Sequence, residues 1–255
     1  MNKGLICVLS LVMAFCFLIG CSKETEEIVV SRDSSSTVSA LPQKDEVELA
    51  LEGTLWCVND QFTYLLFHDG KEVSEYDLSL LDDETEEIEK CLSYAIETNA
   101  KAEKTVYFPY LLGKNDLRWQ YQSKTKTVVP KDDTPSIKQV SMRTFIDEFV
   151  KKIQAAGKEK QWESQAEMNV AAGVRCNYWD TLYQAIDYYL KATLSVEEYA
   201  VFESETKAFE TARQTAMDTA GKDVEGGSLY PVVTGGAYCT QTEKEIQNIL
   251  TKYFS

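Results

Sequence analysis

The sequence predicts an α+β fold: a small mixed N-terminal domain followed by a C-terminal antiparallel bundle of three to four helices. Strand and turn patterns extend to about residue 130, and apolar residues at helical spacing follow from residue 136. A polar link over residues 132–135 separates the two patterns. Hydrophobic residues make up 44% and charged residues 26% of the 255-residue chain, and these ordinary values exclude wholesale disorder.

The predicted mixed domain covers residues 47–130. Residues 61–67, rich in aromatic and branched side chains, predict a strand; a turn follows at His68, and residues 71–78 form the return strand. The segments 105–108 and 117–121 flank a Gly-Lys-Asn-Asp turn, which predicts a β-hairpin. Between these pairs, apolar residues recur at helical spacing and predict a helix over residues 82–99 (Ile88, Cys91, Leu92, Ala95 and Ile96).

The predicted bundle covers residues 136–255. An apolar stripe over residues 145–153 predicts a first helix that ends at Gly157, and a long helix follows from about 160 to 192. Ser195 and Glu198 form a capping box, so another helix begins there and stops at Gly221. A loop with two glycines and a proline then leads to a last helix with Ile246, Ile249, Leu250 and Tyr253.

Residues 1–20 have the features of a signal peptide. Lys3 precedes an apolar run from Leu5 to Ile19, which is shorter than the ~20 apolar residues that span a bilayer. The ending at residues 18–21, Leu-Ile-Gly-Cys, resembles the bacterial lipobox, and this resemblance implies lipidation of Cys21. An ordinary signal or membrane anchor with a coincidental Cys is the alternative.

Residues 21–46 are polar and predict a tether between the lipid and the folded part. Ser22 follows the lipid-bearing Cys, and by resemblance to other lipoproteins the lack of Asp there favours the outer membrane. The expected location is therefore the bacterial cell envelope, on the periplasmic side or at the surface, with the lipid anchor as the only membrane contact.

Charge and rare residue types exclude several functions. The net charge of −15 makes a nucleic-acid partner unfavourable, and a single His excludes a site with several imidazole ligands. Loss of residues 1–20 removes one Lys and no acid, which leaves 25 basic against 41 acidic residues, a net −16. We expect no cofactor, no metal ion and no catalytic residue.

Four cysteines remain beyond the lipidation site: Cys57, Cys91, Cys176 and Cys239. An even number of cysteines in an exported protein favours disulfides, and three pairings are open.

The bundle carries an ordered series of landmarks. Met168 and Asn169 open the long helix, and Asp180 follows them. Phe209 and Arg213 lie four residues apart, and a Gly226-Gly227-Ser228 loop leads to Cys239. This order, over residues 160–252, resembles the lysozyme-inhibitor LprI-like N-terminal domain, a helical module of exported bacterial proteins. The resemblance implies a non-enzymatic protein that binds and blocks a basic lysozyme-type muramidase.

Four departures from the family pattern concern the cysteines, the aromatic position and the step after the Asp. Ala171 stands where the family usually has a Cys, and the Cys expected shortly after Arg213 is also missing. Phe209 stands where the family has a Trp, and residues 183–184 read Tyr-Gln where it has Leu-Asn. One family disulfide is therefore absent or rerouted. The resemblance then implies that Cys176 pairs with Cys239 and that Cys57 pairs with Cys91.

The same residues also have structural interpretations. Met168 and Phe209 lie on helical stripes and are expected in the core. Arg213 binds either a partner's carboxylate or Asp180 across the helices, with the internal pair favoured. The Gly226-Gly227 loop is expected to need a positive φ.

Two other functions remain possible. A hydrolase would need His68 as its base, but a turn histidine at the surface is the simpler interpretation. The alternative to the inhibitor is a surface or periplasmic lipoprotein with a different binding function. In that case residues 47–130 hold an unknown ligand and the bundle is only a scaffold.

Overall fold

Two antiparallel sheets and four longer helices form the fold, and a computed structural model describes it over residues 44–59, 62–82, 88–131, 135–156 and 162–255. The predicted signal peptide, Cys21 and nearly all of the predicted tether lie outside the described residues. The described helices are α1 (Glu46–Leu51), α2 (Met142–Ala155), α3 (Gln165–Thr193), α4 (Val196–Gly221) and α5 (Tyr230–Tyr253), with short 3-10 turns η1 (Asp69–Lys71), η2 (Leu78–Asp82) and η3 (Lys222–Val224).

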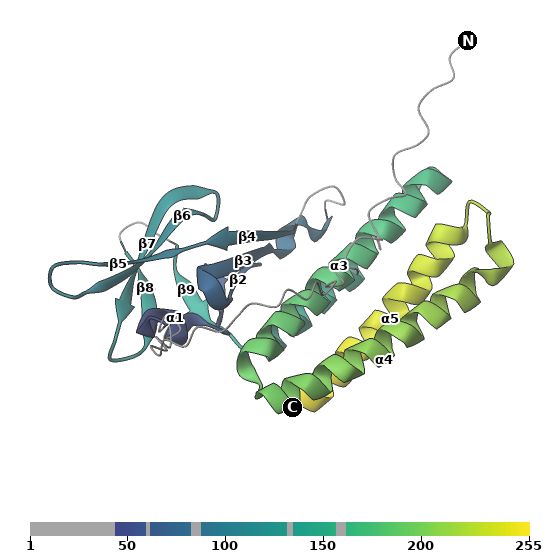
Figure 1. Cartoon of the computed structure of the whole chain (residues 1–255). Helices are drawn as coiled ribbons and strands as arrows, with labels where there is room; N and C mark the ends of the chain where they lie inside the picture. The colour runs from purple at the N-terminus through teal and green to yellow at the C-terminus, as the bar shows by residue number, and fades with distance from the viewer. Residues whose placement is uncertain (1–43, 60–61, 83–87, 132–134, 157–161) are drawn as a thin grey trace, which may run out of the picture. The chain divides into compact units, whose positions relative to one another are not determined.

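Sheet A has the strand order β4-β3-β2-β1-β9, and sheet B has the order β5-β6-β7-β8 (Figure 1). All neighbouring strands within these two sheets pair antiparallel. The strands are β1 (Leu55–Val58), β2 (Thr63–Phe67), β3 (Glu72–Asp77), β4 (Glu89–Ser93), β5 (Ala95–Thr98), β6 (Lys104–Leu111), β7 (Lys114–Gln122), β8 (Thr127–Pro130) and β9 (Ile137–Gln139).

The central strands of sheet A, β1 to β3, are buried on both faces, and the alternation of their side chains shows why. Along β2, Tyr64 and Leu66 pack into a core shared with the helices, whereas Leu65 and Phe67 pack into a second core shared with sheet B. Successive side chains of a strand point to opposite faces. The continuous apolar run at 64–67 therefore marks a central strand between two layers.

The helices run in alternating directions from α2 to α5. Gln154 of α2 contacts Glu243 of α5, whereas Arg143 near the start of α2 contacts Phe254 after the end of α5, so α2 and α5 are antiparallel. Cys176 and Tyr189 of α3 lie beside Cys239 and Phe254, so α3 and α5 run parallel. Helix α4 runs opposite to both and packs on α5, which lies between α3 and α4 (Figure 1).

Serine caps begin three of these helices. The side chain of Ser141 accepts from Thr144 N, that of Ser164 from Glu167 N, and that of Ser195 from Glu198 N. At Ser195 the Glu198 side chain also accepts from the cap backbone, so the predicted capping box is confirmed. The predicted hairpin over residues 105–121 is confirmed as β6 and β7.

The predicted helix over residues 82–99 is wrong. Its described part contains β4, which pairs with β3, and β5, which pairs with β6; residues 83–87 lie outside the described residues. Cys91 lies opposite Ser74 and Leu92 opposite Val73 in the β3–β4 ladder. Hydrogen bonding of this segment to the edge of β3 outweighs the helical spacing of its apolar residues. Such pairing depends on a strand elsewhere in the chain, so the local periodicity cannot predict it.

Backbone hydrogen bonds and side-chain packing both join the regions on the two sides of the predicted boundary at residues 130–136. β9 begins beyond it yet pairs with β1 in sheet A. The core between sheet A and the helices contains Leu55 and Leu66 from the strands together with Phe145 and Ile246 from the helices. The described residues from Lys44 to Ser255 consequently form one compact unit.

Candidate functional site

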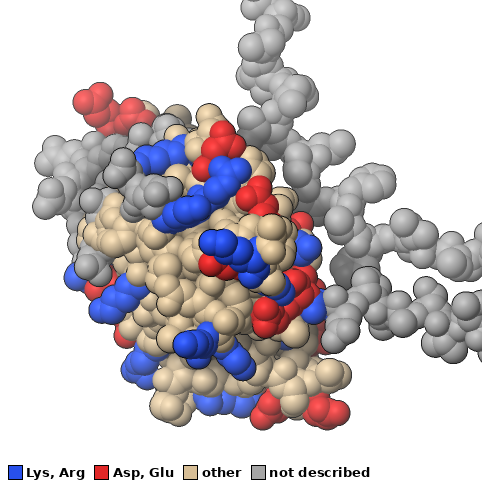
Figure 2. Space-filling model, turned by 90° about the vertical axis from the view of Figure 1, so that its left-hand side faces the viewer, with Lys and Arg blue, Asp and Glu red and all other residues tan. Residues whose placement is uncertain are grey.

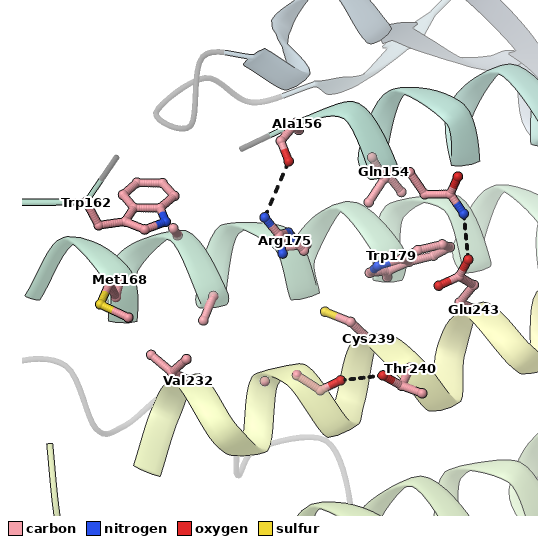
Figure 3. A pocket seen from close by; sticks show the side chains of 15 residues that line it. Gln154, Ala156, Trp162, Met168, Arg175, Trp179, Val232, Cys239, Thr240 and Glu243 are labelled. Atoms are coloured by element: carbon pink, nitrogen blue, oxygen red, sulfur yellow. Dashed lines mark hydrogen bonds between the residues drawn. The ribbon is translucent and has the colours of Figure 1, made fainter. Parts of the chain in front are cut away.

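The candidate site is a groove of about 540 Å³ between α3 and α5, closed on one side by the end of α2 (Figure 3). Its floor contains the nearly buried Ile153, Ala171 and Trp179. The floor also contains Gly235, and a Cβ added there would stand 3.3 Å from Cβ of Ala172 on α3. This close approach of the helix backbones sets the depth of the groove.

Half-buried apolar side chains form the upper part of the groove. Trp162, which precedes α3, and Met168 of its second turn lie on one side, and Val232 of α5 lies on the other. Figure 3 shows Met168 and Val232 facing each other across the opening. Such a surface, apolar with a few polar groups, is typical of a site that accepts a side chain or a short segment of a partner.

Polar contacts hold the two sides of the groove to α2. Arg175 Nη2 of α3 donates to the carbonyl oxygen of Ala156 at 3.4 Å, and Gln154 Nε2 donates to Glu243 Oε1 of α5 at 2.6 Å. Both contacts are drawn in Figure 3. The first is long and involves one of the five N–H donors of the Arg175 guanidinium.

A polar cluster behind the groove joins α3, α4 and α5. Arg213 Nη1 of α4 lies 3.5 Å from Asp180 Oδ1 of α3 and donates to Thr242 Oγ1 of α5 at 3.3 Å. The Tyr238 hydroxyl donates to the same Asp180 oxygen. The predicted internal pair of Asp180 and Arg213 is therefore confirmed, so this guanidinium is committed within the protein.

Aromatic rings complete the surroundings of Arg213. Its Cζ lies 4.1 Å from the centroid of Tyr238 and 4.9 Å from that of Phe209. Burial, followed by the hydrogen bond to Asp180, raises the pKa of Tyr238 above its usual value. Phe209 is 9% exposed and stacks on Tyr183, which confirms its predicted place in the core.

Cys176 and Cys239 lie next to the groove, with their sulfur atoms 3.9 Å apart. The thiol contact with Cys239 lowers the pKa of Cys176, and the same contact together with burial raises the pKa of Cys239. Both are thiols in this structure, and their separation places a disulfide within reach of small side-chain movements.

The implied bond between Cys57 and Cys91 is incompatible with sheet A. Cys57 lies on β1 and Cys91 on β4, with β2 and β3 between them. Three strand spacings place them about 14 Å apart, roughly twice the Cα separation that a disulfide spans. Cys57 is buried against the helices, whereas Cys91 is exposed.

The remaining landmark residues lie at different places. Met168 is half-buried in the groove wall, so its predicted place in the core is not what the structure shows. Asn169 accepts a hydrogen bond from Gln165 Nε2 at 3.0 Å, a contact within α3. Gly226 has φ +73° in the turn before α5, which confirms the predicted positive φ, and Gly227 N donates to Val224 O in that turn.

A second cavity of about 230 Å³ lies between the edge of sheet A and α3, and it contains the single His. Ser74 Oγ donates to Glu89 Oε1 at 2.9 Å, so its only proton is used, and His68 Nε2 at 2.8 Å must donate to it. Ser74 is 1% exposed. This order of donors points the imidazole N–H, rather than its lone pair, at the serine, the reverse of what activation of a nucleophile requires.

His68 lies in the turn after β2, as predicted, but it is half-buried rather than at the surface. Its ring meets Tyr188 of α3 edge-on, with the centroids 4.7 Å apart. Burial lowers the pKa of His68, and the nearby Glu72 and Asp69 oppose this effect.

No group of three or more His, Cys, Asp or Glu side chains among the described residues is arranged to hold a metal ion. Within the same ranges, no helix has the length and apolar character needed to cross a membrane.

Among the groove residues, only Met168 and Cys239 were predicted as site residues from the sequence. Trp162, Arg175 and Val232 belong to no recognised motif, and they converge because α3 and α5 pack in parallel. One signal was present: Gly235 and Gly236 are consecutive glycines inside a helix, which usually marks a packing or functional requirement.

Comparisons with known proteins gave no relative. No family model matches the chain, no curated protein is similar to it, and no solved structure matches its fold. The likeness to lysozyme inhibitors therefore rests on the landmark residues alone.

Proposed function

We propose that this chain is a lipid-anchored cell-envelope protein, without enzymatic activity, that binds a basic lysozyme-type muramidase through the groove between α3 and α5. The observation that carries the proposal is the groove itself: an open apolar site of about 540 Å³ with an arginine and a glutamate at its edges. The lipid anchor at Cys21 would keep this site close to the cell wall.

Charge supports a cationic partner. Residues 165–253, which contain α3, α4 and α5, have seven Lys and Arg against thirteen Asp and Glu. A surface of this sign attracts a basic protein and raises its association rate, most strongly at low ionic strength. The apolar groove would then receive an exposed side chain of the partner, since buried apolar contacts supply affinity that rim charges do not.

A lysozyme turbidity assay with the chain from residue 22 onward tests the proposal. We expect inhibition of a basic lysozyme at low salt, weaker inhibition as salt increases, and direct binding in a pull-down. An absence of both inhibition and binding at high molar excess and low ionic strength would overturn the proposal.

Two adjacent residues of α5 provide a matched pair of variants. Val232 lines the groove between α3 and α5, whereas Val233 lines a shallow depression between α4 and α5. Val232→Arg places a positive charge in the groove and should weaken inhibition at least about ten-fold. Val233→Arg adds the same charge on the other side of the helix and should preserve inhibition. Equal losses of inhibition in the two variants would show that the groove is not the binding site.

The alternative is a surface or periplasmic lipoprotein that binds an unknown small ligand through residues 47–130. It is supported by the second cavity, which combines Glu72, Glu89 and the half-buried His68 with Tyr188 of α3. The two functions differ in their response to variants: ligand binding in this cavity would be sensitive to Tyr188→Ala and indifferent to Val232→Arg.

A further inference from the structure

Sheet B differs in charge from the rest of this acidic protein. Residues 95–131 contain seven Lys and Arg but only three Asp and Glu, a net +4 in a chain of net −15. Figure 2 looks at this side of the molecule and shows Lys and Arg side chains spread across it. Sheet B is therefore a locally basic part of an otherwise acidic chain.

Three of these lysines lie at one end of sheet B. Lys101 is in the turn between β5 and β6, and Lys124 and Lys126 are in the turn between β7 and β8. Because the strands are antiparallel and ordered β5-β6-β7-β8, both turns lie at the same end of the sheet. All three side chains are exposed, and none makes an ion pair with another described residue. We call Lys101, Lys124 and Lys126 the basic turns.

The chain enters the folded unit beside the basic turns. Lys104, the first residue of β6, binds Asp45 at 2.9 Å and Glu46 at 3.1 Å. Asp45 caps α1 and follows Lys44, where the folded unit begins. Lys104 therefore offsets one of these two negative charges, and the segment that leads to Cys21 joins the unit at this end of sheet B.

We propose that the basic turns contact an anionic phospholipid surface and orient the protein with sheet B toward the membrane and the helices away from it. The proposal rests on the lipid anchorage proposed above, which would bring this end of the unit close to lipid head groups. Lysines near an anionic bilayer surface each strengthen binding by about five-fold.

The range of electrostatic forces explains how an acidic protein would bind an acidic surface. At physiological salt, exposed charges are screened beyond about 8 Å. Helix α3 alone has 29 residues, which is about 44 Å of length. The acidic side chains along the helices therefore contribute little at the membrane, whereas the basic turns lie within range.

Vesicle sedimentation with the unlipidated chain from residue 22 onward tests the proposal. We expect binding to vesicles of 70% phosphatidylcholine and 30% phosphatidylglycerol, no measurable binding to pure phosphatidylcholine, and loss of binding at 0.5 M salt. The triple variant Lys101→Glu, Lys124→Glu, Lys126→Glu should reduce partitioning at least about ten-fold.

A matched triple variant supplies the control. Lys207→Glu, Lys222→Glu and Lys244→Glu make the same charge change at exposed positions in or beside α4 and α5, and this protein should bind the vesicles at most about two-fold more weakly. Equal losses in both triple variants, or no dependence on phosphatidylglycerol, would overturn the proposal. Binding to soluble heparin without binding to vesicles would also overturn it, since the surface would then recognise a polyanion in solution. The lysozyme assay contains no vesicles, so the two proposals fail independently.

Discussion

His68 is the only imidazole in the chain, so its protonation is visible as a single pair of ring resonances. It donates to the buried Ser74 and contacts Tyr188, and both contacts hold it away from solvent. Burial disfavours the imidazolium form in the folded protein. His68 therefore reports directly on the contact between sheet A and α3.

We predict that His68 titrates below 6.5 in the folded protein and near 6.5 in urea. Because the unfolded chain binds the proton more readily, the contribution of this group to the free energy of unfolding is complete above pH 6.5. It is lost as the pH falls toward the lower folded-state pKa. NMR titration of the ring protons measures the shift, and the His68→Asn variant should lack this part of the pH dependence. A folded-state pKa at or above 6.5 would contradict the assigned burial.

Cys176 and Cys239 are predicted to form a disulfide when the protein is oxidised, with Cys57 and Cys91 unlinked to each other. On the loop-entropy model, closing the segment between Cys176 and Cys239 adds about 4 kcal/mol to the free energy of unfolding. Non-reducing peptide mapping identifies the pair, and denaturation with and without reductant measures its effect. The Cys176→Ala variant should show no effect of reductant; a Cys57–Cys91 peptide would contradict the strand order of sheet A.

At the scale of elements, Arg213 connects three helices through one side chain. Asp180 is 40% exposed at its side chain, so the ion pair itself contributes at most about 1 kcal/mol. Stacking against Tyr238 and Phe209 adds about another 1 kcal/mol. Arg213 therefore stabilises the arrangement of α3, α4 and α5 through both the charge and the planar shape of its guanidinium.

We predict that Arg213→Ala lowers the free energy of unfolding by about 1–2 kcal/mol. Arg213→Lys should recover less than half of the loss, because an ammonium group keeps the charge but cannot stack as a plane between two rings. Urea denaturation of the two variants and the wild type measures the differences. Full recovery by Lys would show that charge alone matters at this position.

The adjacent glycines of α5 are predicted to respond in opposite directions. A Cβ at Gly235 meets Ala172 at 3.3 Å and Cys176 at 3.6 Å, whereas a Cβ at Gly236 meets nothing within 4 Å. Gly235→Leu should therefore lower the free energy of unfolding by about 1–3 kcal/mol, and Gly236→Ala should raise it by about 0.5–1 kcal/mol. Urea denaturation with unchanged m-values checks both signs.

Local patterns predicted the elements well where local chemistry decides them. The capping box at Ser195 and the hairpin turn near Gly113 depend on neighbouring residues, and both are confirmed. The segment around Cys91 was wrong because its partner strand, β3, lies elsewhere in the sequence. The groove could not be predicted for the same reason: Arg175 and Val232 become neighbours only when α3 and α5 pack in parallel.

At the scale of the whole molecule, sheet A is the layer that joins everything else. One of its faces packs on sheet B and α1, and the other packs on the helices. β9 extends this layer with residues that follow sheet B in the chain. Neither the strands nor the helices can therefore lose their structure without exposing a face of sheet A that the other part covers.

This arrangement predicts a single cooperative unfolding transition for residues 44–255. Leu66, which is fully buried between sheet A and the helices, offers a direct test. Leu66→Ala should lower the free energy of unfolding by about 2–5 kcal/mol. The helical circular-dichroism signal and the fluorescence of Trp56 and Trp119, which lie in the core next to sheet B, should shift together when Trp162 and Trp179 are replaced by Phe so that they do not contribute. If the helical signal were lost in a separate transition, residues 47–130 and 136–255 would be independent folding domains, and the shared core would contribute little to stability.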